Sequence, residues 1–125
     1  MKFEDLQFIF PDATLDTWHV HTNGGGWVEN TATVTDSAYV GPDAIVSGSA
    51  SVSEKASISG HARVSENACV SGDAMVFGRS LVSGDARVFG NARVFGYAWV
   101  SGDARVSGNA WISGSSQVSG NEIIN

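Results

Sequence analysis

The stretch DARVFGNARVFGYAWVSGDARVSGNAWISG, residues 85–114, repeats one six-residue pattern. In its first unit Ala86 and Val88 stand two positions apart, and Gly90 and Asn91 follow them. A spacing of two places both side chains on the same side of an extended strand, whereas a period of six matches no helical stripe. Glycine, Asp and Asn tolerate positive φ and are typical of tight turns. The stretch therefore predicts short strands separated by turns, with Ala and Val facing inward.

The same register extends over most of the chain. Stepping by six from Val28 reaches an aliphatic β-branched residue at every step as far as Ile124. Strand and turn repeated at this interval build a parallel β-solenoid, in which each coil stacks on its neighbours. With this register the chain resembles the hexapeptide-repeat, left-handed β-helix family. The placement of glycine two residues after the aliphatic residue, and the opening NGGGWV at residues 23–28, look like the repeats of small bacterial and phage hexapeptide proteins.

The resemblance implies a triangular coil of three hexapeptides, so that residues 18 apart stack in one column. We therefore expect an all-β, left-handed parallel β-helix of about five coils over residues 28–125. Residues 1–27 break the register, and we expect them to form an N-terminal cap built from the strand-like pieces LQFIF and TWHVH. In the last coil Gln117 and Glu122 make the interior less apolar. This change either protects the exposed edge or leaves it to pair end to end with another molecule.

Composition limits the classes of partner. The chain has 125 residues, about the size of one domain, and a net charge of −6, which argues against a binder of long nucleic acids or anionic membranes. The first residues contain acids and no long apolar run, so they predict neither a signal peptide nor a membrane span. The single cysteine, Cys69, fits a reducing compartment. We expect a cytoplasmic protein, located in the host cytoplasm if it is encoded by a phage.

The informative positions are the outward ones, because serine satisfies the repeat there. The turn residues at one corner form a column that departs from Asp, Asn and Ser at three successive levels, with His61, Arg79 and Tyr97. Trp99 lies beside this corner on the next face. A second face carries a large apolar patch, which predicts an interface between subunits. The residues expected at this interface are Met75, Phe77, Phe95 and Trp111.

The favoured hypothesis is a non-catalytic protein that binds a small anionic ligand. Arginine provides bidentate, permanently charged contacts to phosphate, and aromatic side chains stack on bases. Members of the family that the chain resembles are commonly homotrimers with ligand sites in the clefts between subunits. We therefore expect a homotrimer that holds a nucleotide or cyclic nucleotide signal, as phage proteins that sequester bacterial defence signals do. The residues expected to bind it are His61, Arg79, Arg93, Tyr97, Trp99 and Trp111.

Two alternatives stay open. The best-known activity of the family is acyl transfer from acyl-coenzyme A, for which His61 is the only solenoid histidine available as general base. The chain could instead be a structural β-helix or an adaptor that contacts another protein. We expect no cofactor and no metal, because His19 and His21 lie outside the repeat without a third ligand in reach.

Overall fold

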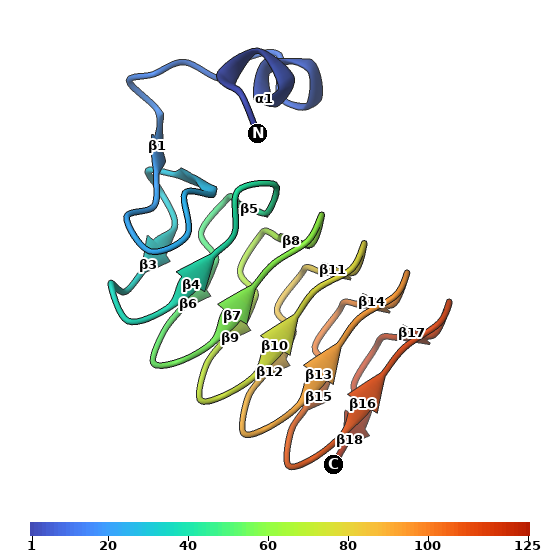
Figure 1. Ribbon diagram of the computed structural model, residues 1–125. Coiled ribbons are helices and arrows are strands. Elements are labelled where there is room, and N and C mark those ends of the chain that lie inside the picture. The colour runs from blue at the N-terminus through green and yellow to red at the C-terminus, as the bar shows by residue number, and fades with distance from the viewer.

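Short strands form where Ala and a β-branched residue alternate with glycine turns, and they build a triangular solenoid (Figure 1). The computed structural model describes residues 1–125. Three sheets run along the prism, with parallel pairing between successive coils, and we name them by their surfaces. The cap-side sheet has the order β1 (Trp18–Val20), β2 (Trp27–Glu29), β5 (Ile45–Val46), β8 (Arg63–Val64), β11 (Leu81–Val82), β14 (Trp99–Val100) and β17 (Gln117–Val118).

The other two sheets contain the remaining strands. The charged sheet consists of β3 (Thr33–Val34), β6 (Ser51–Val52), β9 (Cys69–Val70), β12 (Arg87–Val88), β15 (Arg105–Val106) and β18 (Ile123–Ile124). The aromatic sheet consists of β4 (Tyr39–Val40), β7 (Ser57–Ile58), β10 (Met75–Val76), β13 (Arg93–Val94) and β16 (Trp111–Ile112).

The register confirms the expected stacking of residues 18 apart. On the cap-side sheet Val46 pairs in parallel with Val64, and on the aromatic sheet Val76 pairs with Val94. The inward Ala and Val side chains form one continuous core along the prism. The predicted all-β triangular solenoid with a short N-terminal cap is thus confirmed.

One inward position departs from the repeat without leaving an unpaired polar group. Ser80 stands where most of the other units have alanine and is 1% exposed. Its hydroxyl lies 2.8 Å from the carbonyl oxygen of Phe77 and 3.3 Å from that of Val94. A buried hydroxyl costs little when it is hydrogen-bonded, which explains why serine is tolerated here.

Most turns need glycine because the backbone has a positive φ there and because the next coil leaves no room for a Cβ atom. Gly78 has φ +71°, and a Cβ built on it would lie 2.8 Å from the backbone nitrogen of Gly96 in the next coil. Two turns contain glutamate instead, and Glu54 and Glu66 have φ of 59° and 58°. These two residues adopt a left-handed conformation that ordinary side chains disfavour.

The N-terminal segment differs from the prediction in its first half. The sequence predicts a strand-like piece at LQFIF, but its first four residues belong to helix α1 (Phe3–Ile9) and Phe10 is the C-cap. Helical spacing places Phe3, Leu6 and Phe10 on one side, where Leu6 is fully buried and the other two pack around it. A strand would have pointed successive apolar residues to opposite faces. No helix of the structure is both long and apolar enough to span a membrane.

The second half of the cap follows the prediction. TWHVH contains strand β1, which pairs antiparallel with β2 and so joins the cap to the first coil. Trp18 and Trp27 are buried with Leu6 and Ala13 in a small apolar cluster that is separate from the main core. The cap covers one end of the prism, above β5 in Figure 1.

Candidate functional site

The corner predicted from the turn residues is a continuous column. Backbone nitrogens join successive levels: that of His61 donates to Gly78 O at 2.7 Å, and that of Arg79 donates to Gly96 O at 2.7 Å. Because the glycine ladder holds the backbone, the side chains of the column project outward at regular intervals. Asp43, His61, Arg79 and Tyr97 are all exposed.

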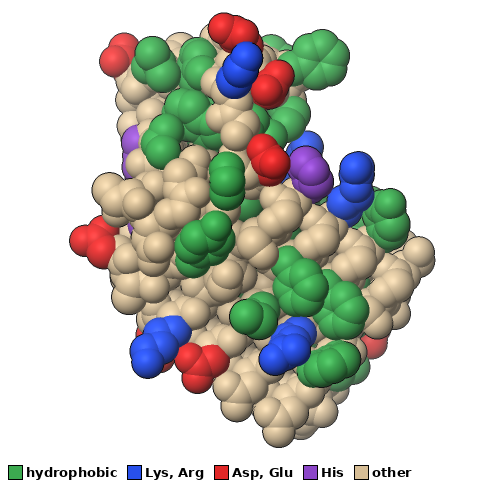
Figure 2. All heavy atoms as spheres, in the orientation of Figure 1, with side chains coloured by type: hydrophobic (Ala, Val, Ile, Leu, Met, Phe, Trp, Pro, Cys, Tyr) green, Lys and Arg blue, Asp and Glu red, His purple; other side chains and the backbone are tan.

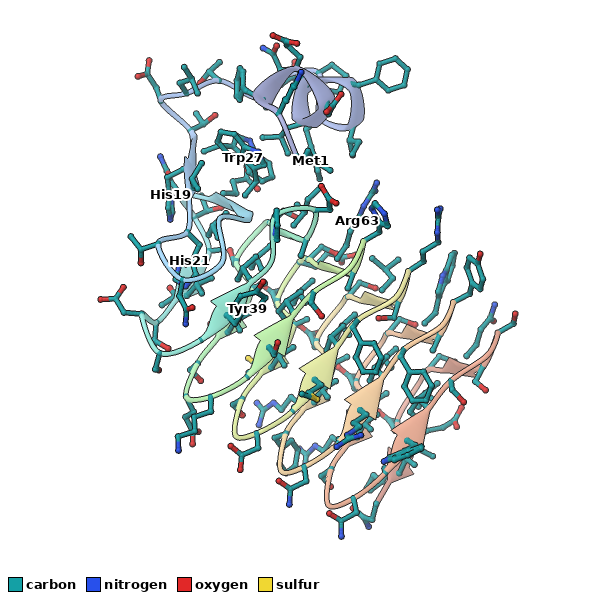
Figure 3. All side chains as sticks on the ribbon, in the orientation of Figure 1. Met1, His19, His21, Trp27, Tyr39 and Arg63 are labelled. Carbon is teal, nitrogen blue, oxygen red and sulfur yellow. The ribbon has the colours of Figure 1, made fainter.

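The neighbouring column on the cap-side sheet is only partly covered by the cap. Its outward residues in order are Trp27, Ile45, Arg63, Leu81 and Trp99. Trp27 donates from Nε1 to the carbonyl oxygen of Met1 at 2.9 Å, and Ile45 is 1% exposed. Figure 3 shows Met1 and Trp27 beneath the helix and Arg63 just beyond it. Arg63 is therefore the first residue of this column outside the cap.

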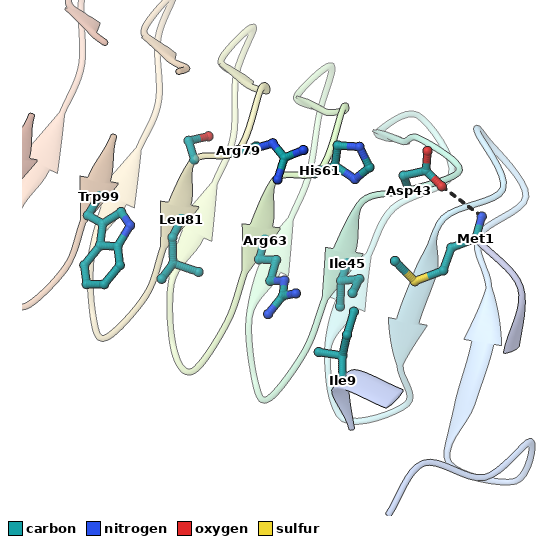
Figure 4. Close-up of a pocket in the computed structure, with 10 residues that line it drawn as sticks. Met1, Ile9, Asp43, Ile45, His61, Arg63, Arg79, Leu81 and Trp99 are labelled. Atoms are coloured by element: carbon teal, nitrogen blue, oxygen red, sulfur yellow. Dashed lines mark ion pairs between the residues drawn. The ribbon is translucent and has the colours of Figure 1, made fainter. Parts of the chain in front are cut away.

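A pocket of about 330 Å³ lies where the corner, the cap-side sheet and the cap meet (Figure 4). We call it the corner pocket. Its lining residues are Met1, Ile9, Asp43, Ile45, His61, Arg63, Arg79, Ser80, Leu81 and Trp99. In Figure 2, histidine and basic side chains gather at the notch between the cap and the coils. The pocket is formed within one chain.

The charges of the corner pocket do not cancel. The one acid in its wall, Asp43, lies 3.1 Å from the N-terminal ammonium group of Met1, which also donates to Pro42 O at 2.6 Å. This is the one ion pair in the structure, so neither Arg63 nor Arg79 has a carboxylate partner. Two guanidinium groups on adjacent coils therefore give the pocket an excess of positive charge.

The structure divides the six residues that the sequence predicted to bind a ligand. His61, Arg79 and Trp99 line the corner pocket. Tyr97 is 63% exposed and is not part of the wall. Arg93 and Trp111 lie together on the aromatic sheet, where the Arg93 guanidinium is 5.3 Å from the centre of the Trp111 ring.

Arg63 is the residue of the pocket that the sequence hypothesis missed. It occupies an ordinary outward position on a strand and not a turn position, and the sequence hypothesis took only Arg93, Trp99 and Trp111 from the strand positions. The available signal was that Arg63 is the only charged residue in a column otherwise made of apolar side chains and Gln117.

The four residues expected at an interface do form one patch on the aromatic sheet. The rings of Phe77 and Phe95 stack with centroids 5.0 Å apart and an interplanar angle of 6°. Trp111 meets Phe95 edge-on at 5.9 Å, and Met75 is 40% exposed beside them. Figure 2 shows hydrophobic side chains gathered on this side of the lower coils, around a basic side chain. We call these four residues the aromatic patch.

A second hollow, of about 720 Å³, lies over the charged sheet. Arg87 pairs in register with Arg105 on the next coil, and Asp85 and Asp103 stand two residues before them at the corner. The other lining residues are Asn67, Cys69, Asn121 and Ile123. Two acids therefore accompany two arginines, and the formal charges of this hollow cancel.

The histidines of the cap are held by hydrogen bonds. His21 is 4% exposed and donates from Nε2 to Ala38 O at 2.8 Å. Nδ1 of His19 lies 2.6 Å from Oδ1 of Asn30. The structure gathers no group of three or more His, Cys, Asp or Glu side chains that could hold a metal ion.

Comparison with known proteins supports the repeat architecture. Residues 86–102 and 104–120 match the family model for the YdcK beta solenoid repeat. The chain is similar to a repeat β-solenoid family. The match covers the later coils, from β12 to β17, and so includes Trp99 but not the rest of the corner pocket. No curated protein and no solved structure matches the chain.

Proposed function

We propose that this protein is a hexapeptide-repeat β-helix that binds a small anionic ligand in the corner pocket without catalysing a reaction. The observation that carries the proposal is the pair Arg63 and Arg79, which have no carboxylate partner in a pocket whose only acid is already paired. Guanidinium groups bind phosphate through charge-assisted hydrogen bonds, which are about twice as strong as neutral ones. An anion would therefore gain more binding free energy in the corner pocket than a neutral ligand of the same size.

The aromatic wall favours a ligand that contains a ring. Trp99 is 52% exposed at the end of the pocket opposite the cap, so one side of its indole is free to stack. Aromatic stacking accepts any nucleobase because every base has a π face. A nucleotide or a cyclic nucleotide signal combines the anion with the ring. The biological role that fits this binding activity is that of a phage anti-defence protein, which sequesters such a signal.

The aromatic patch supports self-association as part of this proposal. Exposed apolar patches of this kind mark interfaces, and aromatic residues, Met and Arg are the types enriched there. We propose that the patch packs against other copies in a homotrimer and that the corner pocket stays open beside the interface. The mass of the purified protein, measured by light scattering, tests this part directly. A monomer would favour the adaptor role, in which the patch contacts a different protein.

The acyltransferase alternative depends on His61 alone. A general base needs a partner that orients its ring, and no side-chain hydrogen bond holds the imidazole of His61. His61 contributes to the binding proposal instead as a polar wall next to Arg79. If the wild-type protein turns over acyl-coenzyme A and His61→Ala does not, the acyltransferase alternative is favoured over the non-catalytic proposal.

The test of the proposal is isothermal titration calorimetry with inorganic phosphate, nucleoside monophosphates, and cyclic mono- and dinucleotides. We expect at least one nucleotide to bind, and Arg79→Ala to weaken it strongly. The matched control is Arg87→Ala, which removes an arginine from the charged sheet. Failure of every nucleotide to bind, or equal losses in the two variants, would contradict the proposal.

A further inference from the structure

We infer that the corner pocket selects a singly charged phosphodiester over a terminal, doubly charged phosphate. This inference rests on the proposed function and names the class of ligand for the same site. It follows from the order in which apolar and charged side chains line the pocket, which is visible in Figure 4.

Both ends of the pocket are apolar. At the cap end the wall is made by Met1, Ile9 and Ile45, and at the other end by Leu81 and Trp99. The cap end is fixed, because Ile45 belongs to the buried cluster of the cap and Ile9 packs against that cluster. The side chains of the two ends offer no hydrogen-bond donor except the indole nitrogen of Trp99, and the Met1 ammonium group at the cap end is engaged by Asp43 and Pro42 O.

The positive charge lies between these ends. Arg63 follows Ile45 in its column and precedes Leu81, and Arg79 stands at the corner next to Leu81. Strands of neighbouring coils are about 4.8 Å apart, so Arg63 and Trp99, two coils apart, are separated by roughly 10 Å along the prism. An anion held by the two arginines would therefore have an apolar wall on each side of it.

This order disfavours a terminal phosphate. A phosphate monoester presents three terminal oxygens that share two negative charges, and the oxygen that the two arginines do not bind would face Ile9 or Ile45. A buried polar group without a partner is costly, and more so when it is charged. The carboxylate of Asp43, although paired with the Met1 ammonium, lies on the same side and would repel a second negative charge.

A phosphodiester avoids both costs. It has one negative charge shared by two oxygens, which Arg63 and Arg79 satisfy from the middle of the pocket. Its two ester substituents then extend toward the apolar ends, one over Leu81 and Trp99 and the other toward the cap. The cap is in this way a specificity-determining wall, in addition to covering the terminal coil.

The experiment compares uridine 5′-monophosphate with its methyl ester and with the dinucleoside phosphate UpU, by calorimetry on the wild-type protein. We expect the two diesters to bind more tightly than the monoester by about tenfold, within the range expected for one unsatisfied buried polar group. A monoester that binds as tightly as the diesters, or more tightly, overturns the inference and leaves the proposed function intact. No binding by any of the three also overturns the inference, whereas the proposed function fails only if the wider nucleotide panel gives no binding.

A gain-of-function variant provides an independent check. Ile9→Lys adds a cationic donor to the cap wall, so it should strengthen monoester binding and close most of the tenfold gap. Phe8→Lys is the matched control, because Phe8 lies on the same helix, is 90% exposed and is absent from the pocket wall. The control should keep the preference for diesters. An unchanged preference in a folded Ile9→Lys protein, or an equal change in both variants, would overturn the assignment of the cap as the selective wall.

Discussion

The corner pocket and the hollow over the charged sheet each contain two arginines, yet they differ in everything that surrounds those arginines. Arg87 and Arg105 stand beside Asp85 and Asp103 on the charged sheet. Arg63 and Arg79 stand between the cap and Trp99, and the one acid nearby is occupied by the N-terminal ammonium group.

This difference shows that arginine content does not by itself make an anion site on a solenoid. Stacking in register places like residues of adjacent coils side by side, so pairs of arginines arise wherever the repeat contains them. Exposed pairs with acids nearby have little excess field, because opposite charges on a wet surface offset one another. The neutralisation of Asp43 and part of the apolar wall at one end of the corner pocket come from Met1 and Ile9 of the cap, which is the part of the chain without repeats.

The largest effect should come from removing both pocket arginines. In Arg63→Ala/Arg79→Ala we expect the affinity for a phosphodiester to fall by about 100-fold or more, since hydrogen bonds between charged groups contribute about 1.5–3 kcal/mol each. The measurement is calorimetric titration of each protein with UpU. The control Arg87→Ala/Arg105→Ala should lose less than about threefold. A similar loss in both double variants would contradict the contrast between the two sites.

The second-largest loss of affinity should come from a variant that loosens the packing of the cap. Leu6 is fully buried in the cap cluster, and a buried Leu→Ala change costs about 2–5 kcal/mol. We expect Leu6→Ala to destabilise the cap, seen as faster amide exchange in α1 and β1, and to weaken ligand binding. Phe8→Ala on the exposed side of the helix should change neither. Full affinity in a Leu6→Ala protein with a loosened cap would show that the cap does not help to form the site.

Loss of the aromatic wall should have a smaller effect. Trp99→Ala removes the ring at the end of the pocket and should cost about 1–2 kcal/mol of binding for a ligand with a base, or roughly tenfold. Trp111→Ala removes a tryptophan of similar exposure, 63% against 52%, from the aromatic patch. It should alter the mass of the assembly and leave the intrinsic affinity unchanged. A loss of affinity in Trp111→Ala with no loss in Trp99→Ala would place the ligand on the aromatic patch and not in the corner pocket.

The smallest effect should be the appearance of weak anion binding over the charged sheet. Asp85→Asn/Asp103→Asn removes the two acids and leaves Arg87 and Arg105 uncompensated. We expect weak binding of inorganic phosphate, with Kd in the range of about 1 mM or above, detected as chemical-shift changes of the two arginines. Asp73→Asn, at a corner without an arginine pair, is the control. Tight binding, comparable with the corner pocket, would mean that the apolar walls contribute nothing.

The sequence predicted those features that repeat. The columns of residues 18 apart, the corner of His61 and Arg79, and the aromatic patch all follow from a period that local turn chemistry enforces at every level. Each of these features depends only on the backbone register, which glycine and the Ala/Val pairs determine.

The features missed by the sequence depend on packing that does not repeat. Whether LQFIF forms a helix is decided by which face Leu6 buries against Trp18 and Trp27, and these residues are far from it along the chain. Arg63 is the only charged residue of its column, but because the position of the cap was unknown, the sequence did not place this side chain in a pocket. Ile9 could not be assigned to the pocket for the same reason.

The most direct test of the account is a crystal structure of the protein with UpU bound. We predict that the phosphate lies between the guanidinium groups of Arg63 and Arg79, with one base against Trp99 and the other nucleoside toward Ile9. A phosphate held by Arg87 and Arg105, or a dinucleotide bound on the aromatic patch with the corner pocket empty, would contradict it.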